Sequence, residues 1–408
     1  MYKILKAPVT IAGGARTPIG RFNGILGKRS AVELGTAAIE AAVERSQVDP
    51  AAVELVVMGN VVSAGLGQGP AKQASDAAGL SKTTVCRSMN SVCGSALAAI
   101  ADCANAIELG MASVAVAGGM ESCSTSPYLI DAIKKDGSRF QCKLAGYKLI
   151  PMEPDLERKI KTREVQTKES TRYDGLYWPP DKKFMKEYAV IYASKMGIKA
   201  EEVDEAAGGS YMKARKATDE GRFKDEIVPV DGYDSDDLVP EDVQAQLREA
   251  GKGDPASAYN SSNPADGGAA IVMLSEEKAR DLGIKPVGLI HGYSVVNCAA
   301  EDFLTAPVDA VRELRAALIS AGRRFDPAIV EANEAFGLQI PIFEKEFAEM
   351  KVNVHGGAVA LGHPLGASGC RLLVTLLNAM KQYGHRYGIV TMCFGSGGAY
   401  AVAVEVPE

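Results

Sequence analysis

Residues 88–97 read Ser-Met-Asn-Ser-Val-Cys-Gly-Ser-Ala-Leu and place one thiol, Cys93, between polar residues and a run of small ones. Apolar residues then recur at helical spacing from Leu97 to Ile107, which predicts a helix that begins just after the thiol. Free backbone N–H groups at a helix N-terminus favour a thiolate, and small neighbours let a substrate approach closely. A buried structural cysteine fits this stretch equally well, because most free cysteines are small core residues.

The bulk composition bounds the class of protein. The chain has 408 residues, enough for two or three domain-sized cores. Hydrophobic residues make up 47% and charged residues 24%, as in an ordinary soluble globular protein. The formal net charge of -6 gives no electrostatic footprint for nucleic acid. No apolar run approaches the roughly 18 residues that span a bilayer. We therefore expect neither a nucleic-acid-binding nor a membrane protein.

The cysteines indicate a reducing compartment. Eight of them are scattered along the chain, and none forms a Cys-x-x-Cys pair. This pattern predicts neither a zinc site nor a disulfide framework. The N-terminal residues lead straight into a strand-like stretch at 9–12, without the apolar segment of a signal peptide. The expected location is the cytoplasm.

Strand and helix signals alternate toward both ends of the chain, which predicts an α/β protein with a largely buried sheet. A glycine-rich stretch at 65–70 is not a dinucleotide-binding loop, because its third glycine falls at the wrong spacing. Strands are predicted at 9–12, 54–58, 113–117, 226–230, 269–274, 286–290, 329–331, 388–392 and 399–406, and helices at 31–47, 188–197, 204–219, 307–321 and 368–382.

A charged excursion separates the two α/β runs. Residues 131–190 hold fourteen Lys or Arg and ten Asp or Glu, and their apolar periodicity is poor until about Phe184. The favoured interpretation is a charged surface or a subunit contact. The alternative is a surface that attracts an anionic ligand such as a nucleotide phosphate.

The chain has four histidines, and one of them stands out. His385 is predicted to be solvated in a surface turn, and His291 to be structural at the end of a strand. His363 lies in the glycine-rich stretch 353–369, directly before a predicted helix. A histidine in a tight Gly-His-Pro turn is positioned rather than mobile, so His363 is a candidate functional residue.

Four motifs together resemble the thiolase family. Shorter matches at 14–20 (Gly-Ala-Arg-Thr-Pro-Ile-Gly) and 118–122 (Gly-Gly-Met-Glu-Ser) support the resemblance, which covers almost the whole chain in the expected order. No single motif decides the matter, but four at this spacing are specific. They are Cys93-Gly94-Ser95-Ala96, Asn333-Glu334-Ala335-Phe336, Gly362-His363-Pro364 and Cys393-Phe394-Gly395.

The resemblance implies an acyl transfer between coenzyme A and a carbon acid. Cys93 matches the family's nucleophile, and His363 the base that forms its thiolate. Cys393 matches the second acid/base, which moves a proton at C2 of the acyl-CoA partner; its reference pKa near 8.5 suits that role. One oxyanion hole is implied for His363 with a water held by Asn333, and another for the backbone N–H groups of Cys93 and Gly395. Coenzyme A is a co-substrate, and neither a bound cofactor nor a metal is implied.

The resemblance also implies a fold and an assembly. We expect two similar βαβαβαββ halves stacked as a five-layer α-β-α-β-α core, with a loop domain inserted in the first half. The expected boundaries are 1–127 and 256–280 for the N-terminal half, 128–255 for the inserted loop domain and 281–408 for the C-terminal half. Family members are usually dimers or dimers of dimers, so a homo-oligomer is expected.

The substrate-binding residues are carried over in part. Ser262 matches the serine that contacts the pantetheine part of coenzyme A, and Met185 and Phe336 are further candidates. Phe184 stands where many biosynthetic thiolases have histidine, and His355 where the family usually has asparagine. His355 is interpreted as a tolerated polar exchange or, less favoured, as an extra polar contact near the site.

The stretch 127–185 is roughly twenty residues longer than in short-chain thiolases, by comparison with the family pattern. With Phe184 it suggests a bulky, even aromatic, 3-oxoacyl-CoA, or alternatively a partner subunit bound through the long loop. The aromatic cluster of Tyr173, Tyr177 and Trp178 is compatible with the bulky substrate.

Three alternatives stay open. A short-chain acetyl-CoA C-acetyltransferase that makes acetoacetyl-CoA has the same motifs. Decarboxylating ketoacyl synthases share the fold but lack the C-terminal Cys-x-Gly turn, so Cys393 argues against them. A non-catalytic acyl-CoA-binding or interaction protein would not need all four reactive positions.

Overall fold

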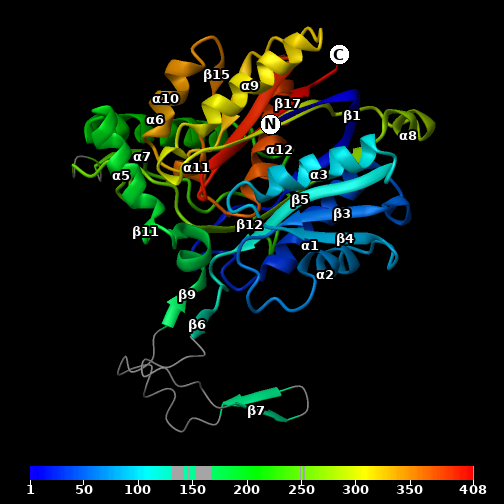
Figure 1. Cartoon of the computed structure of the whole chain (residues 1–408), viewed down its shortest axis with the longest axis horizontal. Helices are drawn as coiled ribbons and strands as arrows, with labels where there is room; N and C mark the ends of the chain where they lie inside the picture. The colour runs from blue at the N-terminus through cyan, green and yellow to red at the C-terminus, as the bar shows by residue number, and fades with distance from the viewer. Residues whose placement is uncertain (131–141, 146–147, 152–166, 249, 251–252, 408) are drawn as a thin grey trace.

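The computed structural model describes residues 1–130, 142–145, 148–151, 167–248, 250 and 253–407 (Figure 1). Its first half begins at the N-terminus and follows the predicted βαβαβαββ order. Its elements are β1 (Tyr2–Arg16), α1 (Ala31–Ser46), β3 (Leu55–Gly59), α2 (Pro70–Ala77), β4 (Val85–Met89), α3 (Ser95–Glu108), β5 (Val114–Ser122) and β12 (Ala265–Leu274), with the short β2 (Gly20–Arg21) and the 3-10 turn η1 (Pro50–Ala52).

The second half repeats the same order of elements. A helix α8 (Glu276–Asp281) precedes it. Its elements are β13 (Gly288–Asn297), α9 (Ala306–Ser320), β14 (Ile329–Ala332), α10 (Gln339–Glu346), β15 (Lys351–Val352), α12 (Ser368–Tyr383), β16 (Tyr387–Phe394) and β17 (Gly398–Glu405), with the short η3 (Ala300–Asp302) and α11 (Ala358–Leu361).

The strands of the two halves lie in equivalent orders, β4-β3-β5-β12-β1 and β15-β14-β16-β17-β13. β3 pairs parallel with β4 and β5, and β14 pairs parallel with β15 and β16. The last two strands of each half in the chain, β5 with β12 and β16 with β17, pair antiparallel. β1 and β13 pair antiparallel, so the halves join into one 11-stranded mixed sheet. The prediction of an α/β fold with two similar halves is confirmed.

Five layers result from the way the helices cover these strands. α3 and α12 lie in the middle, where their apolar side chains and the inward faces of both sets of strands form one core. α1 and α2 pack on the outer face of the first half, and α9 and α10 on the outer face of the second (Figure 1). Most residues of α3 and α12 are buried, because a helix covered on both sides needs apolar or small residues all round.

The insertion lies between β5 and β12, two neighbouring antiparallel strands. Part of the charged stretch 131–190 lies outside the described residues, and the predicted boundaries of the loop domain stay predictions. The described elements of the insertion are β6 (Tyr128–Ile130), β7 (Cys142–Ala145), β8 (Lys148–Pro151), β9 (Thr167–Glu169), the π-helical turn η2 (Thr171–Gly175), β10 (Tyr177–Trp178), β11 (Lys183–Phe184), α5 (Met185–Met196), α6 (Ala200–Asp219) and α7 (Val243–Leu247).

The predicted strands at 9–12, 113–117, 269–274 and 286–290 overlap longer strands in the structure (β1, β5, β12 and β13), and the predicted strand at 226–230 is absent. β5 continues past Gly118 to Ser122, because glycines there let β12 and a loop of the second half approach closely. Residues 226–230 do not form a strand: Ile227 makes an isolated bridge with Arg16, the last residue of β1. The segment therefore meets β1 only at its end, and Pro229 has no N–H with which to extend a ladder.

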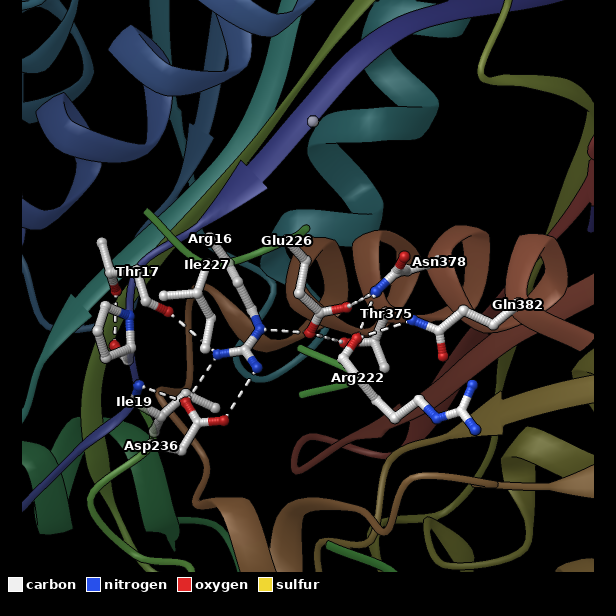
Figure 2. A network of polar contacts seen from close by, with 12 residues as sticks. Arg16, Thr17, Ile19, Arg222, Glu226, Ile227, Asp236, Thr375, Asn378 and Gln382 are labelled. Atoms are coloured by element: carbon white, nitrogen blue, oxygen red, sulfur yellow. Dashed lines mark hydrogen bonds and ion pairs between the residues drawn. The ribbon is translucent and has the colours of Figure 1, made fainter. Parts of the chain in front are cut away.

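A buried polar network joins β1, the insertion and α12 (Figure 2). Arg16, fully buried, donates from Nε to Glu226 at 2.6 Å and from its two terminal nitrogens to Asp236 at 2.7 and 2.9 Å. Glu226 in turn accepts from Thr375 at 3.0 Å and from Asn378 at 3.2 Å. Burial disfavours the guanidinium charge, but the two carboxylates outweigh that effect and raise the pKa of Arg16.

Candidate active site

One cavity of about 730 Å³ brings together reactive groups that are far apart in the sequence. Cys93 comes from the first half, and His363, Cys393 and Gly395 come from the second, while the insertion supplies much of the remaining wall. A cavity of this size fits a small-molecule ligand. The sequence-predicted nucleophile, base and second thiol therefore line one space.

Cys93 lies in the turn between β4 and α3. Val92 takes the left-handed conformation (φ 49°), its N–H donates to the Asn90 side chain at 3.0 Å, and Gly94 caps the helix. Burial raises the pKa of the Cys93 thiol, and the backbone N–H groups of Cys93 and Gly395 oppose this rise only in part. The N–H groups thus favour the thiolate, as expected, but desolvation outweighs them and Cys93 stays a thiol in the resting protein.

His363 lies in a turn that fixes its tautomer. Gly362 before it has φ 95°, and the His363 N–H donates to the Asn263 carbonyl at 2.8 Å. Its Nδ1 lies 2.6 Å from the Ser368 hydroxyl oxygen, and that hydroxyl donates to the Pro364 carbonyl at 2.9 Å. Because a serine has one hydroxyl hydrogen, Nδ1 must carry the proton that it donates to Ser368. The Nε2 lone pair is then available to act as a base.

The electrostatics keep His363 neutral. Burial lowers its pKa to about 3, and the nearby Arg371 guanidinium adds to the effect. Within the described residues Nε2 has no hydrogen-bond partner. A neutral imidazole with a free nitrogen can accept a proton from a thiol at neutral pH.

Cys393 is the next to last residue of β16. Its Sγ accepts from the Gln339 side-chain nitrogen at 3.6 Å, and the same nitrogen donates to the Leu304 carbonyl at 3.0 Å. Burial raises the pKa of Cys393 to about 12, and the Gln339 N–H opposes the rise. Gln339 was not predicted from the sequence, because it is the first residue of α10 and no motif marks its contact with a thiol 54 positions away.

Asn333 follows β14 and does not line the cavity. It is fully buried, and both polar atoms of its side chain lack a partner among the described residues. Its N–H donates to the Thr391 carbonyl at 3.0 Å. Glu334 beside it binds Ser210 and Asn353, which holds this loop in place. Asn333 therefore has a buried amide without a hydrogen-bond partner among the described residues, two positions before Ala335, which lines the cavity.

The predicted substrate-binding residues divide into two groups. Ser262, Phe184, Met185 and Phe336 all line the cavity, and the Ser262 hydroxyl donates to the Ala335 carbonyl at 2.9 Å. His355 does not. It is buried against the rings of Phe223 and Tyr383, 5.6 and 5.8 Å between centroids, and burial lowers its pKa to about 4.

The aromatic cluster lies outside the cavity wall. Tyr173 stacks on Tyr177 at 5.3 Å, and Tyr177 packs against Phe184 at 5.0 Å, but of these three only Phe184 lines the cavity. The Arg172 guanidinium lies 5.4 Å from the Phe184 ring and also reaches the cavity. In the part of the chain that the structure describes, no group of side chains is arranged to hold a metal ion, and no helix is long and apolar enough to cross a membrane.

The two-half α/β fold, with two cysteines and a histidine on one cavity, defines a class of acyl-transferring enzymes. Models of the thiolase N-terminal and C-terminal domains match residues 9–277 and 284–406. The chain belongs to the thiolase family and is an acyltransferase of that family.

Relatives and solved structures agree over nearly the full length. An acetyl-CoA acetyltransferase of Chromobacterium violaceum is 40% identical to this chain, over 98% of this chain and all of that protein. One of Escherichia coli is 38% identical, over 97% of this chain and 98% of that protein. Acetyl-CoA acetyltransferase from Bacillus anthracis matches with a TM-score of 0.85 at 31% identity, covering 99% of this chain and all of that one. A thiolase from Ascaris suum in complex with coenzyme A matches with a TM-score of 0.83 at 32% identity, covering 98% and 100%. These names give the predicted bulky substrate no support.

Proposed function

We propose that the protein cleaves a 3-oxoacyl-CoA with coenzyme A, or in reverse condenses two acyl-CoAs, through an acyl group carried on Cys93. The observation that carries this proposal is the meeting of Cys93, His363, Cys393 and the Gly395 backbone on one cavity. Two neutral thiols and a neutral imidazole supply one nucleophile and two acid/base groups.

The first half-reaction uses both thiols. His363 Nε2 takes the Cys93 proton, and the thiolate attacks C3 of the 3-oxoacyl-CoA. The bond between C2 and C3 breaks, which leaves the acyl group on Cys93, and the electron pair stays on C2 of the departing acetyl-CoA. Cys393 gives its proton to that carbon. Acetyl-CoA then leaves, with Cys393 as a thiolate.

The second half-reaction restores the protein. Cys393 takes the proton of an incoming coenzyme A thiol, and the resulting thiolate attacks the acyl group on Cys93. Acyl-CoA leaves, and the Cys93 thiolate recovers its proton from His363. The N–H groups of Cys93 and Gly395 are proposed to stabilise the oxyanion at the carbon under attack. Both groups favour the negative charge of the Cys93 thiolate, which supports that role. His363 and a water held by Asn333 are proposed to stabilise the enolate oxygen, and the free Asn333 amide supports that role.

We infer that acetoacetyl-CoA is the substrate, because the relatives named above are acetyl-CoA acetyltransferases. A bulkier 3-oxoacyl-CoA is the second candidate. It is favoured by the apolar wall that Phe184, Met185 and Phe336 give the cavity.

Thiolysis of a panel of 3-oxoacyl-CoAs tests both candidates. The panel runs from acetoacetyl-CoA to long-chain, aromatic and dicarboxylic members, and the loss of the free coenzyme A thiol is followed. A kcat/KM clearly highest for acetoacetyl-CoA supports the first candidate and contradicts the second, and activity confined to a bulky member does the reverse. Cys93→Ala is expected to lose all acyl exchange while its circular dichroism stays that of the wild type. A wild type inactive on every member contradicts the proposed function.

We also propose a homodimer or a dimer of dimers. β4 ends the sheet of the first half, and Val85 at its start is 55% exposed, so an edge strand is available for pairing. Light scattering that shows a monomer at micromolar concentration would contradict this assembly.

A further inference from the structure

Glu121, near the end of β5, gathers donors from two loops. Its carboxylate is fully buried and accepts four hydrogen bonds. Three come from the loop after β3: the Asn60 side chain at 3.0 Å, the Val61 N–H at 3.0 Å and the Val62 N–H at 3.2 Å. The fourth comes from the Gly366 N–H at 2.8 Å. A carboxylate with this many N–H partners is held firmly.

The two loops belong to different halves of the molecule. The 60–62 loop lies in the first half, and the Asn60 N–H donates to Met89 at the end of the strand that leads to Cys93. Gly366 lies in the second half, three residues after His363 and two before Ser368. Glu121 therefore connects the part of the chain that carries the nucleophile to the turn that carries the base.

Close backbone packing supports the same connection. A Cβ on Gly119 would lie 1.9 Å from the Gly366 carbonyl oxygen, and a Cβ on Gly59 would lie 2.6 Å from it. A Cβ on Gly366 itself would lie 2.8 Å from the Asn60 Cα and 2.9 Å from the Glu121 carboxylate. Any side chain here would push the loop away, so the glycines let it sit against β3 and β5.

We propose that Glu121 is a positioning residue for the acyl transfer: it holds the turn of His363 at the distance from Cys93 that proton transfer requires. The inference rests on the proposed function, in which His363 is the base for Cys93. Proton transfer needs donor and acceptor within hydrogen-bond reach, and a shift of about 1 Å can cost about 100-fold in rate. The hydrogen bonds of Glu121 go to the two loops and not to Cys93 or His363. Its charge also raises the pKa of the Cys93 thiol, so removing the charge alone would make Cys93 more reactive, and a slower reaction in Glu121→Gln can come only from the displaced loop.

The test compares three variants. Glu121→Gln replaces one acceptor oxygen with a donor that faces N–H groups, and Glu121→Asp shortens the reach between the loops. Glu54→Gln is the matched control, because Glu54 accepts from Ser113 at 2.5 Å and Val114 at 3.2 Å at the opposite ends of β3 and β5. For Glu121→Gln we expect kcat to fall about 100-fold with KM for coenzyme A within about twofold, since only the base is displaced. Glu54→Gln should keep kcat within about twofold.

A second readout measures the Cys93–His363 pair without turnover. The rate at which iodoacetamide alkylates Cys93 at pH 7 should fall at least about tenfold in Glu121→Gln, because a displaced His363 no longer takes the thiol proton. Mass mapping identifies the modified cysteine, and Cys93→Ala gives the background.

The outcomes separate a failure of the positioning role of Glu121 from a failure of the proposed function. A folded Glu121→Gln with wild-type kcat and alkylation rate overturns the positioning role, as does a loss no larger than in Glu54→Gln. If Glu121→Gln does not fold, Glu121→Asp is judged by the same two rates. A wild type without thiolase activity contradicts the proposed function instead, and the alkylation rates then still test whether Glu121 sets the Cys93–His363 geometry.

Discussion

Burial sets the protonation states in which the reactive residues begin. It raises the pKa of the Cys93 thiol and lowers that of His363 to about 3, so the pair starts neutral at pH 7. In the proposed reaction the thiolate forms as the Cys93 proton moves to His363 Nε2, which has no hydrogen-bond partner among the described residues. That Cys93, His363 and Cys393 belong together could be inferred from the sequence, because short motifs mark them. The residues that hold them, Gln339 and Ser368 among others, could not.

Glu331 gives a prediction for the pH dependence of stability. Its carboxylate is buried and has no hydrogen-bond partner among the described residues, and burial raises its pKa to about 8, with Arg371 opposing the rise. The folded protein thus binds this proton more tightly than the unfolded chain, whose glutamate has a pKa of about 4.3. The stability that this contributes is full below pH 4 and is lost as the pH rises toward 8.

Glu331→Gln should remove this loss of stability at higher pH. The free energy of unfolding of the variant minus that of the wild type should therefore rise between pH 5 and pH 8, by at most about 1.4 kcal/mol per pH unit, and level off above pH 8. Urea unfolding at four pH values measures the difference. A difference that is constant or falls over this range would show that Glu331 is ionised in the folded protein at pH 5.

At the scale of elements, the helices whose apolar residues recur regularly could be predicted from the sequence. The long helices 31–47, 307–321 and 368–382 agree with α1, α9 and α12 to within a residue or two at each end, because their apolar residues recur at helical spacing. The segment 226–230 has the composition of a strand but lies where no strand can pair along its length. The less favoured interpretation of His355, an extra polar contact near the site, fails for a similar reason: nothing in the sequence says which side of a glycine-rich loop faces the cavity.

The crossing of α3 and α12 predicts the effect of one methyl group. A Cβ on Gly369 of α12 would lie 2.8 Å from the Leu97 backbone nitrogen and Cγ of α3. Gly369→Ala must therefore separate the two helices whose N-termini follow Cys93 and His363. We expect a loss of about 1–3 kcal/mol in stability and a fall in kcat.

Gly209→Ala is the control for that substitution, since Gly209 lies within α6 with open space around it. It should stabilise the protein by up to about 1 kcal/mol, because alanine favours the helix, and leave kcat unchanged. Thermal unfolding and thiolysis are measured on both variants. A Gly369→Ala variant as stable and active as Gly209→Ala would contradict the close contact of the two helices.

At the scale of the whole molecule, a buried ion pair helps hold three parts of the chain together. Arg16→Met leaves Glu226 and Asp236 buried without their counter-charge and should cost about 3–5 kcal/mol. The control is Arg312→Met, whose exposed ion pair with Glu346 should contribute at most about 1 kcal/mol. Urea unfolding gives both values. Equal losses in the two variants would mean that the buried network adds no more than a surface pair.

The pairing of β1 with β13 gives the chain the symmetry of a dimer. Antiparallel contact between two equivalent edge strands is what a two-fold axis produces when identical copies meet. α3 and α12 occupy equivalent places in the two halves, and the residues that precede them, Cys93 and His363, both line the cavity. Equivalent ends of the two halves carry different side chains, the Cys93 thiol before α3 and the His363 imidazole before α12, so the two-fold symmetry of the fold is broken at the cavity.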